Sequence, residues 1–431
     1  MEVTLITERI RSFDKRTEID IKPITFLVGE NSSGKSTLLS ALNALGEPAG
    51  FPFNTNFNRA PFNLGTFSTI ATDSGGRAGR ASSFILGFSL ISGKRKNRVV
   101  ATYVNSDGYP MVSSVHVINN SGSAKFDIVK NQLKVTFVVS DSQHAVVVGM
   151  PRREMTSSSA IINRLLQKMM SDSKSKKGRR RDDHAIGSLF QILTNGLNQY
   201  PRTSSLAPIR TKPKRTYEPG VKPYSAEGEH IPFRIARTFA EETPQEQDIA
   251  LMEALSEFGK SAGMFDGISP RFLGSAKLAN PFQLMVNTAG KKAVLTDVGY
   301  GVSQVLPVIV ESITNKDSDY LLLQQPEVHL HPKAQAALGM LFAKLTAEQL
   351  IHPLIIETHS DYIIDRVRLA VSQGVLRPEQ VTIVFLEKVG RFSQAHQLSL
   401  DDRGNILNTP LRYREFFMRE QLQLLQRTVN V

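Results

Sequence analysis

The fold of this chain is decided by the stretch ITFLVGENSSGKSTLLSALNAL, residues 24–45. It opens with a run typical of a buried strand and closes with the apolar spacing of a helix. Between them, GENSSGKST at residues 29–37 fits the pattern G-x-x-x-x-G-K-[ST], in the strand–loop–helix context that such a loop requires. The stretch therefore predicts a loop whose backbone N–H groups hold phosphate.

Each residue type in this loop has a role in phosphate binding. Gly29 and Gly34 let the backbone turn tightly, so that successive N–H groups point at phosphate oxygens. Lys35 would reach the β and γ phosphates, and the Ser36 hydroxyl would ligate Mg²⁺. We therefore expect ATP and Mg²⁺ as cofactors, held by Gly29, Glu30, Asn31, Ser32, Ser33, Gly34, Lys35, Ser36 and Thr37.

Two further apolar strands end in polar residues, and a glycine pair precedes a helix. LLLQQPEVHLHP at residues 321–332 would lie beside the phosphate-loop strand, with its polar end towards the metal and the γ-phosphate. LIIETHS at residues 354–360 ends near His359, which we interpret as a γ-phosphate sensor, although a histidine at a strand end can also be structural. In TDVGYGVSQVLPVIV, residues 296–310, the two glycines either present N–H groups to an anion or form a simple turn.

Outward from these motifs, the chain shows two kinds of pattern. Residues 80–150 hold alternating apolar runs separated by turn signals such as SDG and NNSGS, which predicts an antiparallel meander. Residues 280–390 alternate strands with helices, which indicates a mostly parallel sheet. We therefore expect an α/β fold with a mixed or parallel core sheet split between residues 1–50 and 280–390, plus an antiparallel β part and a helical insertion.

The insertion itself is expected to contain helices over 157–170 and 184–199, joined by the basic connector SDSKSKKGRRRDD. Residues 201–235 are rich in proline and read as irregular. The expected domain boundaries are 1–80 for the N-terminal ATPase lobe, 81–150 for the antiparallel β part, 151–235 for the helical and basic insertion, 236–390 for the C-terminal ATPase lobe, and 391–431 for a final strand and helix.

Composition limits the classes of function. The 431 residues include no cysteine, which excludes disulfides, thiol catalysis and cysteine-based metal sites. The start MEVTLITERI lacks the layout of a signal peptide, and no run of 18 apolar residues occurs, so we expect a cytoplasmic protein without a membrane partner. The net charge of +12 favours a polyanionic partner.

The positive charge is concentrated in the insertion and its exit. KRKNR at 94–98 and RTKPKR at 210–215 contribute, and one short segment holds six basic residues. Such a cluster suits phosphate contacts with nucleic acid, whereas a solvated loop is the alternative. The candidate nucleic-acid residues are Lys174, Lys176, Lys177, Arg179, Arg180 and Arg181.

The order of the motifs resembles that of ABC-type ATPases of the SMC, RecF and OLD branch. The chain is similar in particular to short bacterial single-chain members found in anti-phage defence systems such as Septu and some retrons. The resemblance spans most of the chain, is patchy over about 85–200, and is carried by GENSSGKST, QQPEVHLHP and ETHSD, with FNLGTFSTIA, LAPIRTKPKRTY and RYREFFMREQLQLL. It implies an ABC-type ATPase head that dimerises head to head around two ATP molecules.

The resemblance also implies roles for single residues. The signature motif, which contacts the γ-phosphate of ATP on the partner subunit, corresponds to Gly299, Tyr300, Gly301 and Val302. Its usual serine is Gly299 here, so only backbone contacts are expected at that position. His331 falls in the D-loop, which crosses the dimer interface, and His359 is the switch histidine. Asn63 is the candidate for the Q-loop position.

The Walker B-like strand departs from the family pattern. The family has an acidic metal-shell residue and then the general base, whereas this chain has Gln324 and Gln325. Gln324 is the candidate metal residue beside Ser36, and its amide oxygen can still accept a hydrogen bond from a metal-bound water. Gln325, by contrast, cannot take a proton from the attacking water near neutral pH. Losing a base costs about 10²–10⁴ in rate. Glu327 either substitutes or simply begins the next helix. We expect slow hydrolysis at a site formed by Lys35, Gln325, Glu327 and His359.

A nuclease activity is not expected in this chain. OLD-type proteins carry a nuclease domain after the ATPase, but only about 70 residues follow ETHSD here. We therefore expect a slow ATPase of an anti-phage defence system that regulates a separately encoded nuclease or toxin, for which RYREFFMREQLQLL offers an amphipathic docking face or a core helix. The alternatives are a SMC- or RecF-like repair or recombination ATPase, which long heptad arms would favour, and a nucleotide-bound scaffold that does not hydrolyse.

Overall fold

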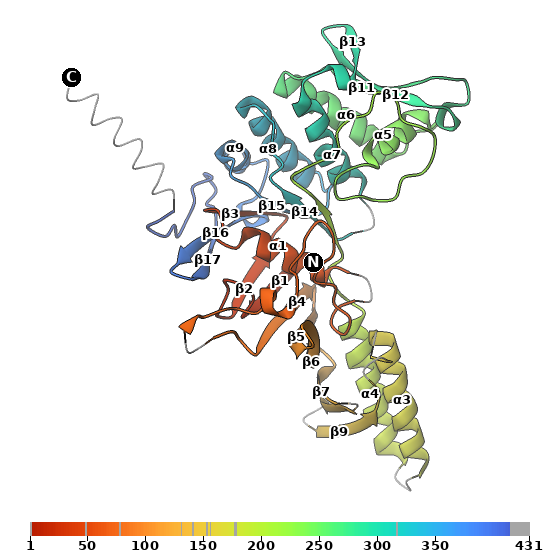
Figure 1. Cartoon of the computed structure of the whole chain (residues 1–431), viewed down its shortest axis with the longest axis vertical. Coiled ribbons are helices and arrows are strands. Elements are labelled where there is room, and N and C mark those ends of the chain that lie inside the picture. The colour runs from red at the N-terminus through yellow and green to blue at the C-terminus, as the bar shows by residue number, and fades with distance from the viewer. Residues whose placement is uncertain are drawn as a thin grey trace, which may run out of the picture.

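The described part of the chain folds around three β-sheets, most of whose strands are labelled in Figure 1. The computed structural model describes residues 2–47, 50–76, 79–130, 132–139, 142–151, 154–155, 157–175, 179–315 and 318–413, with the backbone alone over 172–175 and 179–185. RYREFFMREQLQLL lies outside the described residues from position 414 onwards. No helix in the described ranges has the length and apolar character that a membrane span requires.

A six-stranded sheet carries the phosphate loop. Its order is β10-β14-β15-β3-β16-β17, and its pairs are parallel except β16 with β17. β10 lies within the segment predicted to be irregular, because its four residues find an edge position beside β14. The strand bounds are Ile24–Gly29 for β3, Thr203–Leu206 for β10, Tyr320–Gln324 for β14, Leu354–Glu357 for β15, Val381–Val389 for β16 and Phe392–Leu398 for β17.

Both faces of this sheet are buried, which explains the continuous apolar runs of its strands. Leu27, Leu322 and Ile355 face one cluster of core residues, and their neighbours in sequence face the other. The first core includes α1 and the antiparallel sheet, and the second includes α5 to α9. The helix bounds are Lys35–Leu45 for α1, Phe67–Ile70 for α2, Ile231–Ala240 for α5, Glu246–Ala262 for α6, Tyr300–Thr314 for α7, Pro332–Ala347 for α8 and Asp361–Ser372 for α9.

The predicted meander is confirmed as part of an eight-stranded antiparallel sheet of order β2-β1-β4-β5-β6-β7-β8-β9. The first two strands come from the start of the chain, so the proposed boundary at residue 80 would divide a continuous sheet. The bounds are Glu2–Glu8 for β1, Thr17–Ile21 for β2, Ser83–Ser92 for β4, Arg95–Ser106 for β5, Tyr109–Asn119 for β6, Gly122–Val129 for β7, Gln132–Val139 for β8 and Ser142–Gly149 for β9.

The helical insertion is a hairpin of α3 (Ser158–Ser175) and α4 (Arg179–Leu197), which lie side by side at one end of the molecule (Figure 1). The predicted connector is therefore wrong over most of its length, because residues 171–175 belong to α3 and residues 179–183 begin α4. α4 packs on β5, β6, β7 and β8, and α3 packs on β9.

The third sheet is antiparallel and lies near α5 and α6, at the other end of the view in Figure 1. It contains the runs PFQLMVN and KKAVLTD, which we expected among the strands of the α/β part. They pair in an antiparallel sheet instead. The second run follows the first across a two-residue turn, and the first run pairs with residues 267–272 after a loop over 273–281. A parallel neighbour would need a long crossover. The bounds are Gly267–Phe272 for β11, Phe282–Thr288 for β12 and Lys291–Val294 for β13.

Candidate nucleotide-binding site

The phosphate loop joins β3 to α1, and its two glycines are required by its shape. Gly29 has φ +143°, and a Cβ there would lie 2.3 Å from the Leu386 carbonyl oxygen. Gly34 has φ +102°, and its Cβ would lie 2.7 Å from the Phe13 ring. Residues with side chains rarely adopt these angles, so the loop can close this tightly only with glycine.

Lys35 lies folded under the loop. Its side chain is buried, and Nζ donates to the carbonyl oxygens of Gly29 and Glu30, each at 2.8 Å. Burial lowers the Lys35 pKa, and the carboxylates of Glu357 and Glu30 oppose this effect. The ammonium is therefore held at the loop by neutral backbone acceptors, and phosphate oxygens would offer it charged acceptors in their place.

The loop also has free hydrogen-bonding capacity that fits a nucleotide phosphate. The Ser33 hydroxyl oxygen is buried and has no hydrogen-bond partner. The first N–H groups of α1 lack helical acceptors, as at every helix start. Buried polar groups are normally satisfied, so an unpaired hydroxyl beside these N–H groups and the Lys35 ammonium matches an anion with several oxygens.

The ends of β14 and β15 lie next to this loop. In the parallel register Gln324 is opposite Glu357, and Glu357 is opposite Leu27 on β3. The Ser36 hydroxyl donates to Glu357, with 3.0 Å to each carboxylate oxygen. Gln324 Nε2 donates to the same carboxylate at 3.3 Å. The expected metal groups Ser36 and Gln324 are thus brought together by Glu357, which we did not predict although it stands in ETHS.

The turn after β14 places Glu327 against the backbone of His359. Gln325 has φ +43° and makes backbone hydrogen bonds, its N–H donating to the Glu357 carbonyl at 2.8 Å. Glu327 Oε1 accepts from the His359 N–H at 2.8 Å, and its Oε2 is buried without a partner. The idea that Glu327 begins the next helix is wrong, because α8 starts at Pro332.

His359 lies between groups of both charges. Partial burial and the Lys35 ammonium lower its pKa, in that order, while the carboxylates of Glu327 and Glu357 oppose the shift. The imidazole is therefore neutral at pH 7 and can donate or accept a hydrogen bond. This arrangement suits a group that senses a phosphate oxygen, and the backbone of the same residue is fixed by Glu327.

A buried arginine that we predicted only as part of a basic segment connects this turn to α7. Arg210 is 2% exposed and donates to the carbonyl oxygens of Gln304 at 3.1 Å, Gln324 at 3.3 Å and Gln325 at 3.4 Å. Burial lowers its pKa to about 10, and Glu327 opposes the shift. Arg210 is thus still charged at neutral pH, and it is not a surface contact for nucleic acid. The sequence offered little indication of this role, because a single arginine in a basic segment is not distinguishable from an exposed one.

Other basic residues are also partly neutralised within the chain. Arg215 pairs with Asp297 at 2.9 Å, and Arg98 pairs with Glu18 at 2.6 Å. Lys174 lies in the last turn of α3, and the three arginines of the predicted cluster form the first turn of α4. Lys176 and Lys177 lie outside the described residues.

The residues predicted to form the signature motif lie at the start of α7. Gly299 is the N-cap, and the Tyr300 ring contacts the His329 ring edge-on, with centroids 5.0 Å apart. A Cβ on Gly301 would lie 2.7 Å from the His329 carbonyl oxygen. Over the described ranges, no hydrogen bond joins residues 299–302 to the phosphate loop of the same chain.

Two further predicted residues have structural positions away from the loop. His331 is exposed and caps α8, with Nδ1 accepting from the Lys333 N–H at 3.4 Å. Asn63 is exposed, and its carbonyl oxygen accepts from Arg11 at 3.2 Å. Neither side chain makes a hydrogen bond to residues 29–37 within the part of the chain that the structure covers.

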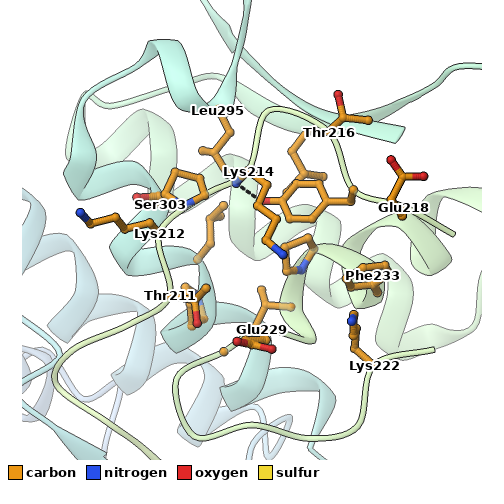
Figure 2. Close-up of a pocket in the computed structure, with 18 of the residues that line it drawn as sticks. Thr211, Lys212, Lys214, Thr216, Glu218, Lys222, Glu229, Phe233, Leu295 and Ser303 are labelled. Carbon is orange, nitrogen blue, oxygen red and sulfur yellow. Dashed lines mark hydrogen bonds between the residues drawn. The ribbon is translucent and has the colours of Figure 1, made fainter. Parts of the chain in front are cut away.

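A cavity of about 250 Å³ lies beside α7 rather than at the phosphate loop (Figure 2). Lysines 212, 214 and 222 and glutamates 218 and 229 line it, together with Ser303 of α7. The Lys214 N–H donates to the Tyr217 hydroxyl across its wall at 3.1 Å. Because none of the predicted nucleotide-site residues lines this cavity, it is separate from the phosphate loop.

Comparison with known families gives two matches that together span residues 4–365. One family is described as "AAA domain, putative AbiEii toxin, Type IV TA system" and matches residues 163–365. The other is described as an AAA domain and matches residues 4–183. Both matches are to ATPase domains of the AAA type. ATPase domains of this type bind nucleotide, usually with Mg²⁺. A search of curated proteins found no match.

Solved structures similar to this chain include three SMC heads. The SMC head domain from Thermotoga maritima has a TM-score of 0.40 and 10% identity, covering 92% of this chain and 98% of its own. The SmcHead bound to the C-winged helix domain of ScpA has a TM-score of 0.45 and 12% identity, and the match covers 92% of this chain and 97% of that structure. The Smc head domain with an extended coiled coil, bound to the C-terminal domain of ScpA from Pyrococcus furiosus, has a TM-score of 0.40 and 11% identity. The match covers 99% of this chain and 100% of that structure.

Proposed function

We propose that this chain binds ATP with Mg²⁺ and hydrolyses it slowly, and that two copies close head to head on two nucleotides. The observation that carries the proposal is the loop over residues 29–37, where the Lys35 ammonium and the unpaired Ser33 hydroxyl are ready for phosphate oxygens. Residues 299–302, at the start of α7, would contact the ATP that is bound to the partner subunit.

Slow hydrolysis is supported by the turn after β14. The Gln325 position follows the end of the strand, but an amide there cannot accept a proton from water. The remaining groups can still position and stabilise the phosphates, on which phosphoryl transfer mostly depends.

The test is phosphate release by the wild type beside Gln325→Glu, with Lys35→Ala as the control that loses nucleotide. We expect the glutamate variant to be faster by about 10²-fold or more. Wild-type turnover of many per second, or a glutamate variant that is no faster, contradicts the proposal. Retained nucleotide with no phosphate release from either protein would favour the scaffold alternative instead.

We further propose that the chain is the regulatory subunit of a bacterial anti-phage system with a separately encoded nuclease or toxin. The family described as a putative toxin of a Type IV TA system supports a two-component arrangement. Co-expression with the product of the neighbouring reading frame tests it. The wild type is expected to form a complex and restrain toxicity, and Lys35→Ala to alter that restraint. A neighbour that neither binds nor harms cells contradicts it.

The helical hairpin bears on the SMC- or RecF-like alternative, which long heptad arms would favour. Its helices of 18 and 19 residues would each be about 27 Å long. Both pack on the antiparallel sheet for part of their length, so the hairpin is not a free arm. DNA-stimulated hydrolysis in the absence of any second protein would favour this alternative.

The end of the hairpin is the proposed nucleic-acid contact. Arginines in the first turn of α4 oppose the helix dipole, so helix stability does not explain their position. Changing Lys174, Arg179, Arg180 and Arg181 to glutamine should flatten the salt dependence of DNA or RNA binding. The matched control is Lys291→Gln with Lys292→Gln on β13. Equal salt slopes in the two variants would show that the cluster makes no phosphate contact.

A further inference from the structure

Glu357 is a buried carboxylate at the centre of the candidate site. It is the last residue of β15, the strand that lies between the phosphate-loop strand β3 and the Walker B-like strand β14. Its relative exposure is 4%. A carboxylate in such a position normally needs a cation, because burying an unpaired charge is costly.

The hydrogen-bond partners of Glu357 are neutral. They are the Ser36 hydroxyl, at 3.0 Å from both carboxylate oxygens, and the Gln324 amide, at 3.3 Å from Oε2. The nearest cation is the Lys35 ammonium, which is bonded to backbone carbonyl oxygens instead of to this carboxylate. The negative charge of Glu357 is therefore incompletely compensated in the nucleotide-free chain.

We propose that Glu357 supplies the carboxylate of the nucleotide-associated Mg²⁺ site, in place of the acidic residue that Gln324 replaces. This inference rests on the proposed function of ATP binding. Magnesium bound to nucleotide keeps several waters and takes one or two protein carboxylates together with phosphate oxygens. Across the described ranges, no group of three or more His, Cys, Asp or Glu side chains could hold a metal by itself, so the phosphates must contribute.

Ser36 and Gln324 fit this assignment as the neighbours of Glu357. A hydroxyl can donate its hydrogen to a carboxylate and keep its lone pairs for a metal or a water. The Gln324 amide uses its N–H to orient Glu357, which leaves its oxygen as an acceptor. Glu357 and Gln324 are opposite each other in the parallel register. The carboxylate therefore stands on β15 instead of β14, and the Gln324 amide on β14 orients it.

With the carboxylate on β15, the site has an acidic group for the metal but none at the position of the usual general base. Glu357 restores a carboxylate beside Ser36, but the side chain at Gln325 remains an amide, and Glu327 is engaged with the His359 backbone. The site thus retains metal-dependent nucleotide affinity while it lacks a base at the usual position.

The experiment measures nucleotide affinity by calorimetry over a series of Mg²⁺ concentrations, and with EDTA, using a non-hydrolysable ATP analogue. Glu357→Gln should raise the Mg²⁺ concentration for half-maximal binding by ~10–100-fold, with little change in EDTA. Gln324→Glu added to Glu357→Gln should recover part of that loss by returning a carboxylate to β14. Glu379→Gln, an exposed carboxylate on the same half of the chain, is the matched control and should behave as wild type.

Thermal unfolding separates a metal role from a structural one. Glu357→Gln removes a buried negative charge, so its melting temperature in EDTA should equal or exceed that of the wild type, while its stabilisation by Mg²⁺ and nucleotide together should shrink. Identical Mg²⁺ curves for wild type and Glu357→Gln, or a melting temperature that falls in EDTA without a change in those curves, overturn the inference. If the wild type binds no nucleotide with or without metal, the proposed function itself is wrong.

Discussion

The Glu327 carboxylate accepts a hydrogen bond of 2.8 Å from the backbone N–H of His359. This bond ties the turn after β14 to the turn after β15, so Glu327 and the His359 backbone are coupled. The other oxygen of Glu327 is buried and has no hydrogen-bond partner, so it is available as a proton acceptor. Glu327 is for that reason the carboxylate best placed to support the residual hydrolysis.

Glu327→Gln should lower the single-turnover rate of ATP hydrolysis by about 10²-fold or more, because the amide removes the proton acceptor. ATP affinity should change by less than about threefold, since no phosphate contact is lost. Rapid-quench measurement of a single turnover, with affinity from the same titration, checks both. An unchanged rate would assign Glu327 to holding the His359 backbone alone.

The His359 pKa should lie below 6.5 in the nucleotide-free protein, as measured by NMR titration, because burial and Lys35 disfavour the imidazolium. Below pH 6.5 the unfolded chain then binds more protons than the folded chain, so this residue lowers the free energy of unfolding as the pH falls, and the loss is absent above that pH. Lys35→Met should raise the His359 pKa by removing a positive charge. Lys291→Met, on a different sheet, should leave it unchanged.

Arg210→Ala should reduce the free energy of unfolding by about 1–3 kcal/mol, because it removes a buried donor that is hydrogen-bonded to carbonyl oxygens of α7 and the β14 turn. Urea unfolding measures the effect. The control is Arg215→Ala in the same segment, whose pair with Asp297 is exposed and contributes at most about 1 kcal/mol. Equal losses in the two variants would contradict the structural role of Arg210.

Gly299→Ser should be tolerated, because a Cβ there meets nothing within 4 Å and the residue has φ −55°. It returns the usual hydroxyl of the signature motif, so ATP-dependent dimerisation in analytical ultracentrifugation should become tighter. Gly301→Ser is the contrasting variant. Its Cβ would lie 2.7 Å from the His329 carbonyl oxygen, and the clash should cost about 1–3 kcal/mol. Equal stability and dimerisation in both variants would argue against this reading of α7.

The sequence alone determined the phosphate loop and the class of fold. The loop pattern needs only local order, since glycines, Lys35 and Ser36 are placed by a strand and a helix that are adjacent in sequence. The antiparallel meander was predictable for the same reason, because successive strands pair across short turns. The strand within residues 201–235 could not be predicted from the sequence. β10 is a strand because it pairs with the edge of β14, which lies more than a hundred residues later in the chain.

Only the tertiary structure decided which carboxylates reach the site. Glu357 faces Gln324 and Ser36 because β15 inserts between β14 and β3, and the register of a parallel sheet is not encoded by any short stretch. The burial of Arg210 has the same origin, since its three acceptors come from α7 and the β14 turn. The pattern of residues fixed the chemistry available along the chain, and long-range pairing between strands selected which of those groups meet.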